Sequence, residues 1–208
     1  MHRERKTGRG WPMCVSRSTM IATMKFVHWL RYWYYAYWSQ PEHERQIFRA
    51  LKNGSCRSLV EIGVQDGRCA ERILRWLKDC GTTVRYTGID LFEARPAAPL
   101  SYSVKEVYRR LARWTPHLRL VPGDPLTALR RTANDLRETD VLIIHADQDE
   151  SSLVHAWPYV PRMLTSQSII LREVPVEGAR QRLTFARLTL GDVEHLAAAS
   201  RSGARRAA

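Results

Sequence analysis

Short apolar segments alternate with amphipathic segments along most of the chain, and this alternation constrains the fold more than any other feature. The apolar segments predict strands at residues 58–63, 84–90, 118–121, 141–146 and 168–174. The segments between them predict helices at about 68–79, 104–114, 125–136 and 151–164. Strands that are apolar on both faces and alternate with helices are typical of a parallel sheet covered on both sides. The sequence therefore predicts a doubly wound, mostly parallel α/β fold.

The two ends of the chain differ in composition from its middle. Residues 1–23 are basic and aperiodic, which predicts a disordered N-terminus, and residues 24–57 predict a helical extension. Residues 58–199 hold the α/β pattern, which closes with one more strand at about 182–190 and a short helix to about Ala199. Residues 200–208 predict a disordered basic tail.

The net charge of +12 does not indicate a nucleic-acid partner, because it is concentrated at the ends. Residues 1–57 contain 11 Lys and Arg against 3 acids, and residues 201–208 add 3 Arg. Residues 58–200 are nearly balanced, with 19 basic and 18 acidic side chains, so the body presents no phosphate-binding field. Four cysteines without metal-site spacing favour a reducing compartment, and we expect a cytoplasmic protein.

An aromatic segment, Met24 to Trp38, predicts a helix with Phe26, Leu30, Trp33 and Tyr37 on one face. Charged residues interrupt it, and it is shorter than the roughly 20 apolar residues that a membrane-spanning helix needs. A membrane role is therefore disfavoured. We expect this face to pack on the domain, over the acceptor side of the predicted crevice, or against its copy in a homodimer.

The first predicted strand ends in a glycine-containing loop that leads directly into a helix. Glu61, Gly63 and Gly67 mark this loop, and the helix start supplies unpaired backbone N–H groups for a ligand. A dinucleotide fingerprint would have a glycine where Gln65 stands, and no phosphate-binding loop of the GxxxxGK[ST] kind is found. A cofactor without a pyrophosphate is therefore favoured. The alternative of a nucleotide-dependent oxidoreductase has only one residue in its support, Asp90 at the end of the next predicted strand.

Asp90 ends the second predicted strand, 27 residues after Gly63. In an open parallel sheet a carboxylate at this position lies beside the ligand crevice at the carboxyl ends of the strands. Such a carboxylate accepts hydrogen bonds from both hydroxyls of a ribose. Asp90 is therefore a candidate ribose-binding residue.

From Glu61 to Val174 the chain resembles class I S-adenosylmethionine-dependent methyltransferases. Glu61, Gly63 and Gly67 match the acid-x-Gly-x-x-x-Gly motif, and Asp90 matches the ribose-binding acid. The resemblance implies a Rossmann-like sheet and S-adenosylmethionine as the cofactor. It also implies cofactor contacts for four further residues, which are Val64, Leu91, Phe92 and Asp124.

The fourth predicted strand, DVLIIHADQDE, resembles the Asp-Gly-Asp or Asp-Ala-Asp segment of small bacterial methyltransferases. Asp147 matches the last acid, but His145 replaces the first, which is a ligand in the metal-dependent members. The Asp-Asn pair that follows their fifth strand is Arg172 and Glu173 in this chain. We therefore expect no metal, although His145, Asp147 and Glu173 leave a small metal site chemically open.

His145 is also a candidate general base, and His145 and Asp147 are the candidate catalytic residues. The sequence thus predicts a methyltransferase that acts on a small molecule. The family ends in a two-stranded hairpin, but one strand and a helix are found after Val174. That shortfall keeps open a non-catalytic binding or scaffold protein that uses the aromatic helix.

Overall fold

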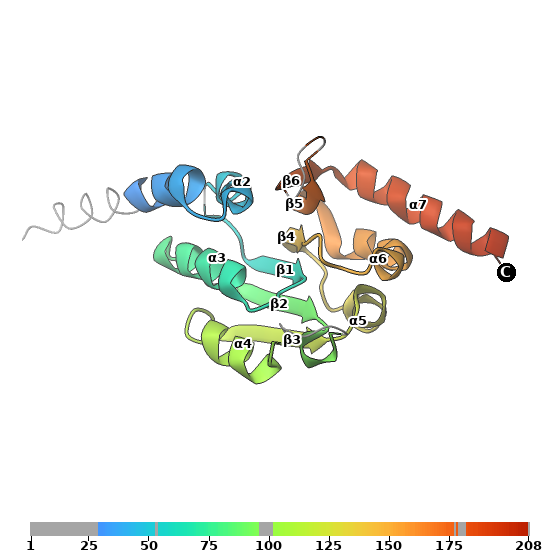
Figure 1. Cartoon of the computed structure of the whole chain (residues 1–208), viewed down its shortest axis with the longest axis horizontal. Coiled ribbons are helices and arrows are strands. Elements are labelled where there is room, and N and C mark those ends of the chain that lie inside the picture. The colour runs from blue at the N-terminus through green and yellow to red at the C-terminus, as the bar shows by residue number, and fades with distance from the viewer. Residues whose placement is uncertain (1–28, 53, 96–101, 177, 179–181, 208) are drawn as a thin grey trace, which may run out of the picture.

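The computed structural model describes residues 29–207 except 53, 96–101, 177 and 179–181, and its strands form one sheet between two helical layers (Figure 1). The strand order is β3-β2-β1-β4-β5-β6, parallel throughout except for the antiparallel pair β5 and β6. The strands are β1 (Ser58–Ile62), β2 (Arg85–Asp90), β3 (His117–Pro122), β4 (Thr139–Ile144), β5 (Leu164–Pro175) and β6 (Leu183–Leu188). The predicted doubly wound α/β fold is confirmed. Among the described residues the sheet has one further strand after β5, the antiparallel β6, as the short C-terminal sequence suggested.

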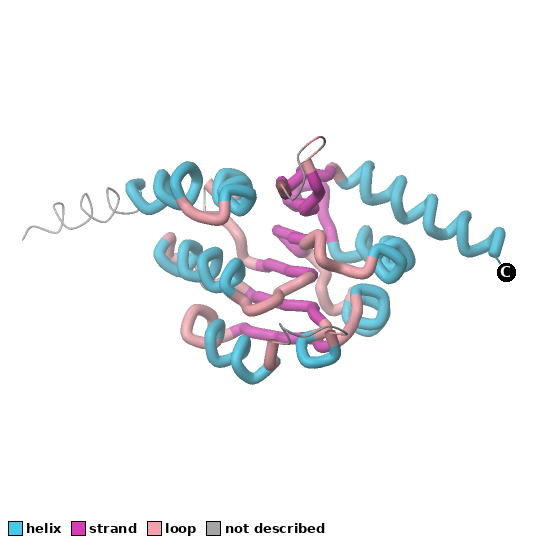
Figure 2. Tube along the Cα trace, in the orientation of Figure 1, coloured by secondary structure: helices cyan, strands magenta, loops and turns pink. Residues whose placement is uncertain are grey.

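Helices lie on both sides of the sheet, as Figure 2 shows. They are α2 (Arg45–Ala50), α3 (Arg68–Asp79), α4 (Val104–Leu111), α5 (Pro125–Thr132), α6 (Glu150–Ala156) and α7 (Leu190–Ala207). Short 3-10 turns add η2 (Glu42–Glu44), η3 (Phe92–Ala94) and η4 (Trp157–Met163). Pro158 and Pro161 explain why the predicted helix at 151–164 becomes α6 followed by η4, because proline interrupts the α-helical hydrogen-bond pattern.

Successive residues of each strand enter two different cores. On β1, Leu59 packs against α2, α3 and α4, whereas Val60 and Ile62 pack against α5, α6 and α7. The same alternation on β4 places Ile143 in the first core, beside α2, α3 and α4, and Ile144 in the second core, beside α5, α6 and α7. This period of two decides which side of the sheet each polar residue at a strand end reaches.

The aromatic segment packs with the face opposite to the one predicted. Residues 29–33 are α-helical and continue into the π-helical turn η1 (Tyr34–Trp38). Tyr32 lies beside Trp76 of α3, and Tyr35 stacks on Phe48 of α2 at 4.6 Å between ring centroids. The predicted core face is exposed at Leu30, Trp33 and Tyr37, and Trp29, Tyr34 and Trp38 beside it are exposed as well. The prediction for Phe26 lies outside the described residues.

The described part of the segment, residues 29–38, does not line the pocket at the carboxyl ends of the strands. Its ion pair between Arg31 and Asp79 holds it beside the far end of α3. Aromatic contacts made within the segment explain the reversed orientation, because Trp33 stacks on Tyr37 at 4.7 Å and leaves Tyr32 and Tyr35 to fill the core.

The C-terminal helix is longer than predicted. Helix α7 runs to Ala207, whereas the sequence suggested an end near Ala199 and a disordered tail from residue 200. Its C-terminal part is rich in alanine and arginine, which favour helix, and Val193 and Ala197 anchor the start in the second core. Among the described residues, no helix has the length and hydropathy to cross a membrane.

Candidate functional site

Three polar residues meet at the carboxyl ends of neighbouring strands β1, β4 and β5. Glu61 shares the α3-facing side of β1 with Leu59, and His145 directly follows β4 on that same side. Glu173 lies next to His145 because β4 and β5 pair in the register Ile144 to Arg172. All three side chains are buried, with Glu61 fully inaccessible to solvent. Local strand geometry therefore brings an imidazole between two carboxylates.

A continuous hydrogen-bond network joins these groups. His145 Nε2 lies 2.9 Å from Glu61 Oε1, and its Nδ1 lies 3.3 Å from Glu173 Oε2. The Tyr86 hydroxyl donates to Glu61 Oε2 at 2.6 Å. On the other side, His43 Nε2 lies 3.1 Å from Glu173 Oε1. The network therefore runs from η2 through β5 and β4 to β1 and β2.

The carboxylates set the charge of His145. Burial by itself lowers the pKa of His145, but the hydrogen bonds to Cys69, Glu173 and Glu61 outweigh it and hold this pKa well above the usual range. Burial raises the pKa of Glu173, yet its bonds to His145 and to the Ala146 N–H leave that pKa below its ordinary value. In the absence of another ligand, His145 is therefore an imidazolium held between the side chains of Glu61 and Glu173.

The pKa of His43 is shifted in the opposite direction to that of His145. Burial lowers the pKa of His43, and the Glu173 carboxylate offsets only part of that shift. The imidazole is therefore neutral at neutral pH. Its side chain remains 23% exposed.

A pocket of about 390 Å³ opens directly above the network. The loop after β1 forms one wall through Gly63, Val64, Gln65 and Asp66. The other walls come from η2, the first turns of α3, the ends of β4 and β5, and β6; they are lined by Pro41, His43, Glu44, Arg68, Cys69, Arg72, His145, Asp147, Glu173 and Leu183. Of the predicted site residues, Gly63, Val64, His145 and Asp147 line this pocket.

The two motif glycines are required by the chain's own packing. Gly63 has φ +95°, and a Cβ there would lie 2.5 Å from Gln148 Nε2 and 2.9 Å from His145 Cβ. Gly67 has φ +75° at the start of α3, and a Cβ there would lie 3.1 Å from Val107 of α4. Both positions need glycine, because L side chains rarely adopt these φ angles and the neighbouring atoms leave little space.

Asp90 lies behind the pocket, and Arg95 already binds it. Arg95 donates to both carboxylate oxygens, from Nε at 2.9 Å and from Nη2 at 2.6 Å, and its Nη1 donates to Asp147 at 2.7 Å. The backbone N–H groups of Gln65 and Phe92 donate to Asp90 at 2.8 Å each. Burial raises the pKa of Asp90, but these hydrogen bonds outweigh it and place the pKa below the usual value.

The remaining predicted cofactor residues do not line the pocket. Phe92 is fully buried in the first core, and Leu91 is partly buried at the start of η3. Asp124 caps helix α5 by accepting from Thr127 N at 3.1 Å, and it also accepts from the Ser152 hydroxyl. These bonds outweigh its burial and lower the pKa of Asp124 to about 2. Asp124 is therefore the N-cap of α5.

Several residues of the site were not predicted from the sequence. His43 and Glu44 come from the short turn η2, and Glu44 pairs with Arg72 of α3. Arg95 follows η3 in a segment with no motif. Only Tyr86 carried a usable signal, because strand alternation places it on the same face as Glu61.

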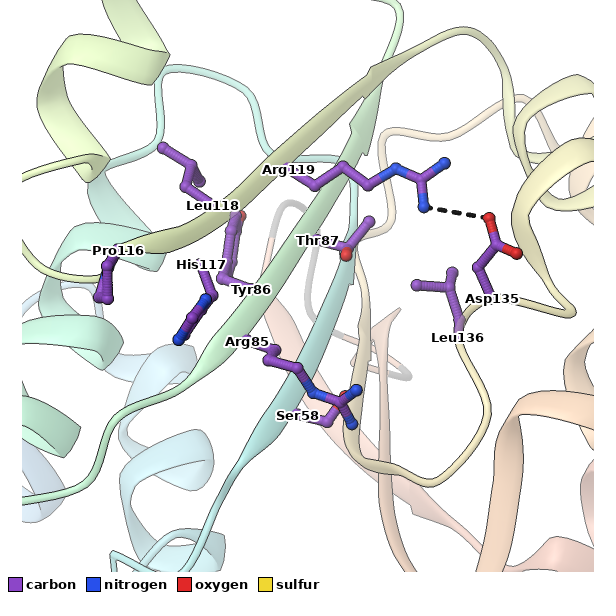
Figure 3. A pocket seen from close by; sticks show the side chains of 10 residues that line it. All are labelled: Ser58, Arg85, Tyr86, Thr87, Pro116, His117, Leu118, Arg119, Asp135 and Leu136. Carbon is purple, nitrogen blue, oxygen red and sulfur yellow. Dashed lines mark hydrogen bonds and ion pairs between the residues drawn. The ribbon is translucent and has the colours of Figure 1, made fainter.

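A second pocket, of about 300 Å³, lies at the opposite end of the sheet (Figure 3). The first residues of β1, β2 and β3 line it, namely Ser58, Arg85 and His117, and Arg119 pairs with Asp135 across it at 3.2 Å. Ligands of open α/β sheets bind at the carboxyl ends of the strands, so the first pocket is the stronger candidate.

No family model matches the sequence, and no curated protein matches it either. Solved structures do resemble the fold. A putative caffeoyl-CoA O-methyltransferase from Staphylococcus aureus has 13% identity and a TM-score of 0.49, over 84% of this chain and 79% of that one. An O-methyltransferase from Bacillus cereus in complex with SAH has 14% identity and a TM-score of 0.48, over 77% and 68%.

A precorrin 8w decarboxylase from Methanobacterium thermoautotrophicum has 16% identity and a TM-score of 0.47. The match covers 67% of this chain and 65% of the decarboxylase, so it spans less than two thirds of that protein. At these identities the likenesses concern the fold alone. What the pocket binds must be argued from the residues of this chain.

Proposed function

We propose that the chain is a methyltransferase that binds S-adenosylmethionine at the carboxyl ends of β1 and β2 and methylates a small molecule. The observation that carries the proposal is the convergence of Glu61, the Gly63–Gly67 loop and Asp90 on adjacent strand ends beside one pocket. Some of the similar solved structures contain S-adenosylhomocysteine, which is consistent with this choice of cofactor.

Two parts of the site fit the cofactor, and Arg95 would have to release Asp90 for the second of them to bind it. The loop Val64–Asp66 lines the pocket and offers backbone groups to the methionine part, beside the helix start of α3. Asp90 has the two acceptor oxygens that a ribose diol needs, and it already receives the Gln65 N–H that orients it. When bound, the cofactor supplies an electrophilic methyl group on a sulfonium sulfur.

The chain's own residues position the acceptor and receive its proton. His145 is poorly suited as a base, because both ring nitrogens are bound by carboxylates and its pKa is raised. His43 lines the pocket, is neutral at neutral pH, and is oriented by Glu173. We therefore assign proton acceptance to His43 and a positioning role to His145. Asp147 lines the wall in an ion pair with Arg95, and a polar acceptor that can hydrogen-bond to this carboxylate is favoured.

The alternative is a binding protein that keeps this fold without turnover. Two observations favour it: Arg95 occupies the Asp90 carboxylate, and the aromatic helix exposes six large apolar side chains. In that case the exposed aromatic face would be the functional surface.

Isothermal titration with S-adenosylmethionine, S-adenosylhomocysteine and NAD tests the cofactor assignment. The proposal expects one site per chain for the first two compounds and none for NAD. Binding of NAD alone would contradict it. A turnover screen with small amines, phenols and thiols then separates the enzyme from the binding protein, because only the enzyme produces S-adenosylhomocysteine. In that screen, His43→Gln should lower kcat and leave cofactor affinity unchanged.

A further inference from the structure

The buried network contains a set of three ligand atoms that converge on one point. These are the carboxylate of Glu61 on β1, the thiol of Cys69 in the first turn of α3, and the imidazole of His145 after β4. One ligand atom from each lies within 4.8 Å of the other two. Tetrahedral zinc ligands bound at about 2.0–2.3 Å lie roughly 3.3–3.8 Å apart, so shifts of about an ångström close the site.

The surroundings of these three residues match those of a metal centre. His145 turns its second ring nitrogen to Glu173, which His43 and the Ala146 N–H hold in place. Metal-binding histidines usually donate their other N–H to a carboxylate in this way. Glu61 accepts a hydrogen bond from the buried Tyr86 hydroxyl on its second oxygen. The outer partners that orient a histidine and a carboxylate ligand are therefore both present.

From this geometry we propose that Glu61, Cys69 and His145 bind a zinc ion in the floor of the pocket. One thiolate and one imidazole favour zinc over magnesium or calcium, which prefer oxygen ligands. A thiolate, a carboxylate and a neutral imidazole balance the two charges of the ion, so the buried centre becomes neutral. Burial and the nearby Glu61 raise the pKa of the Cys69 thiol in the free protein, so the thiolate forms only as the ion displaces its proton.

Binding exchanges protons for the ion. The thiol proton of Cys69 and the proton shared by His145 Nε2 and Glu61 leave to solvent, while Nδ1–H remains bonded to Glu173. Cys69 and His145 line the pocket whereas Glu61 does not, so the fourth position of the ion faces the pocket and accepts water or an acceptor heteroatom. This zinc site does not include Asp90. It also differs from the metal site that the sequence left open, which was His145, Asp147 and Glu173, because Asp147 instead bonds to Arg95 and Gln148.

Cobalt titration tests the proposal in the absence of any adenosyl cofactor. Chelator-treated full-length protein is titrated with Co²⁺, which reports a bound thiolate by a near-ultraviolet charge-transfer band and tetrahedral geometry by strong visible bands. We expect saturation at one Co²⁺ per chain and loss of the bands when Zn²⁺ is added. Wild-type protein without the charge-transfer band would overturn the proposal.

The variants assign the ligands. Cys69→Ser should lose the charge-transfer band, and Cys69→Ala serves if the serine variant does not fold. Cys56→Ser is the matched control, because Cys56 is also buried but lies outside the cluster, and it should keep the band. Tyr86→Phe should weaken Co²⁺ binding by roughly 10–100-fold while keeping the band. A band that survives loss of the Cys69 thiol, or disappears in Cys56→Ser, would show that another cysteine binds the metal.

The outcome of the Co²⁺ titration does not depend on whether the chain binds S-adenosylmethionine. Asp90→Ala should leave Co²⁺ binding unchanged even if it abolishes binding of S-adenosylmethionine. A chain that binds cobalt but no adenosyl cofactor would retain this inference and remove the methyltransferase assignment.

Discussion

Arg95 controls how available Asp90 is to a ligand. Its guanidinium donates hydrogen bonds to both oxygens of the Asp90 carboxylate, which is fully buried. A ribose diol would need these same two oxygens as acceptors. We predict that Arg95→Met binds S-adenosylhomocysteine more tightly than wild type, by on the order of tenfold, because the hydroxyls no longer compete with a cation. Isothermal titration checks this, and weaker binding by a folded variant would show that Arg95 itself contacts the cofactor.

The same substitution has a pH-dependent cost in the free protein. Hydrogen bonds from Arg95 help to hold the pKa of Asp90 below its unfolded value, so their stabilisation is present above about pH 4. It is lost as the pH falls through the folded-state pKa of Asp90. We therefore predict that Arg95→Met lowers the free energy of unfolding at pH 7 and that the difference from wild type shrinks in acid. Denaturant unfolding at several pH values measures it, and a pH-independent difference would contradict the ion pair.

At the scale of elements, the aromatic segment has an inner and an outer face. Tyr35 stacks on Phe48, while its neighbour Tyr34 is 57% exposed. We predict that Tyr35→Ala destabilises the fold by roughly 1–3 kcal/mol, because it removes an aromatic pair and opens the core. Tyr34→Ala is the matched control and should stay within about 0.5 kcal/mol of wild type. Equal effects in thermal unfolding would mean that the segment packs with its other face.

Much of the element pattern could be predicted, because the strands follow local rules. Alternation along β1, β4 and β5 is sufficient to place Glu61, His145 and Glu173 on one side of the sheet. The sequence does not contain an equivalent rule for Arg95 or His43, which reach the site from an irregular segment and a single 3-10 turn. The reversed face of residues 29–38 was also beyond prediction, because helical periodicity identifies two aromatic faces without deciding which one packs.

At the scale of the whole molecule, the exposed aromatic face predicts self-association. Trp29, Trp33, Tyr37 and Trp38 lie on the outer side of the segment, and an apolar patch of this kind marks an interface. We predict a homodimer that the double variant Trp33→Ser and Trp38→Ser converts to a monomer with little change in melting temperature. Sedimentation velocity distinguishes the two states. A monomeric wild type would contradict the predicted dimer. Tight binding to anionic lipid vesicles would indicate that the aromatic face binds a membrane surface instead.

The proposed function requires that the carboxyl ends of β1 and β2 bind an adenosyl cofactor through Asp90. Titration of S-adenosylhomocysteine into Asp90→Ala tests it, with Asp140→Ala as the control. Asp140 also accepts two backbone N–H groups, from Arg57 and Ser58, but at the opposite end of the sheet. We predict that Asp90→Ala weakens binding by about 1.5–3 kcal/mol, since charge-assisted hydrogen bonds to two hydroxyls are lost, and that Asp140→Ala binds as wild type does. An unchanged dissociation constant for folded Asp90→Ala would show that Asp90 does not bind the cofactor.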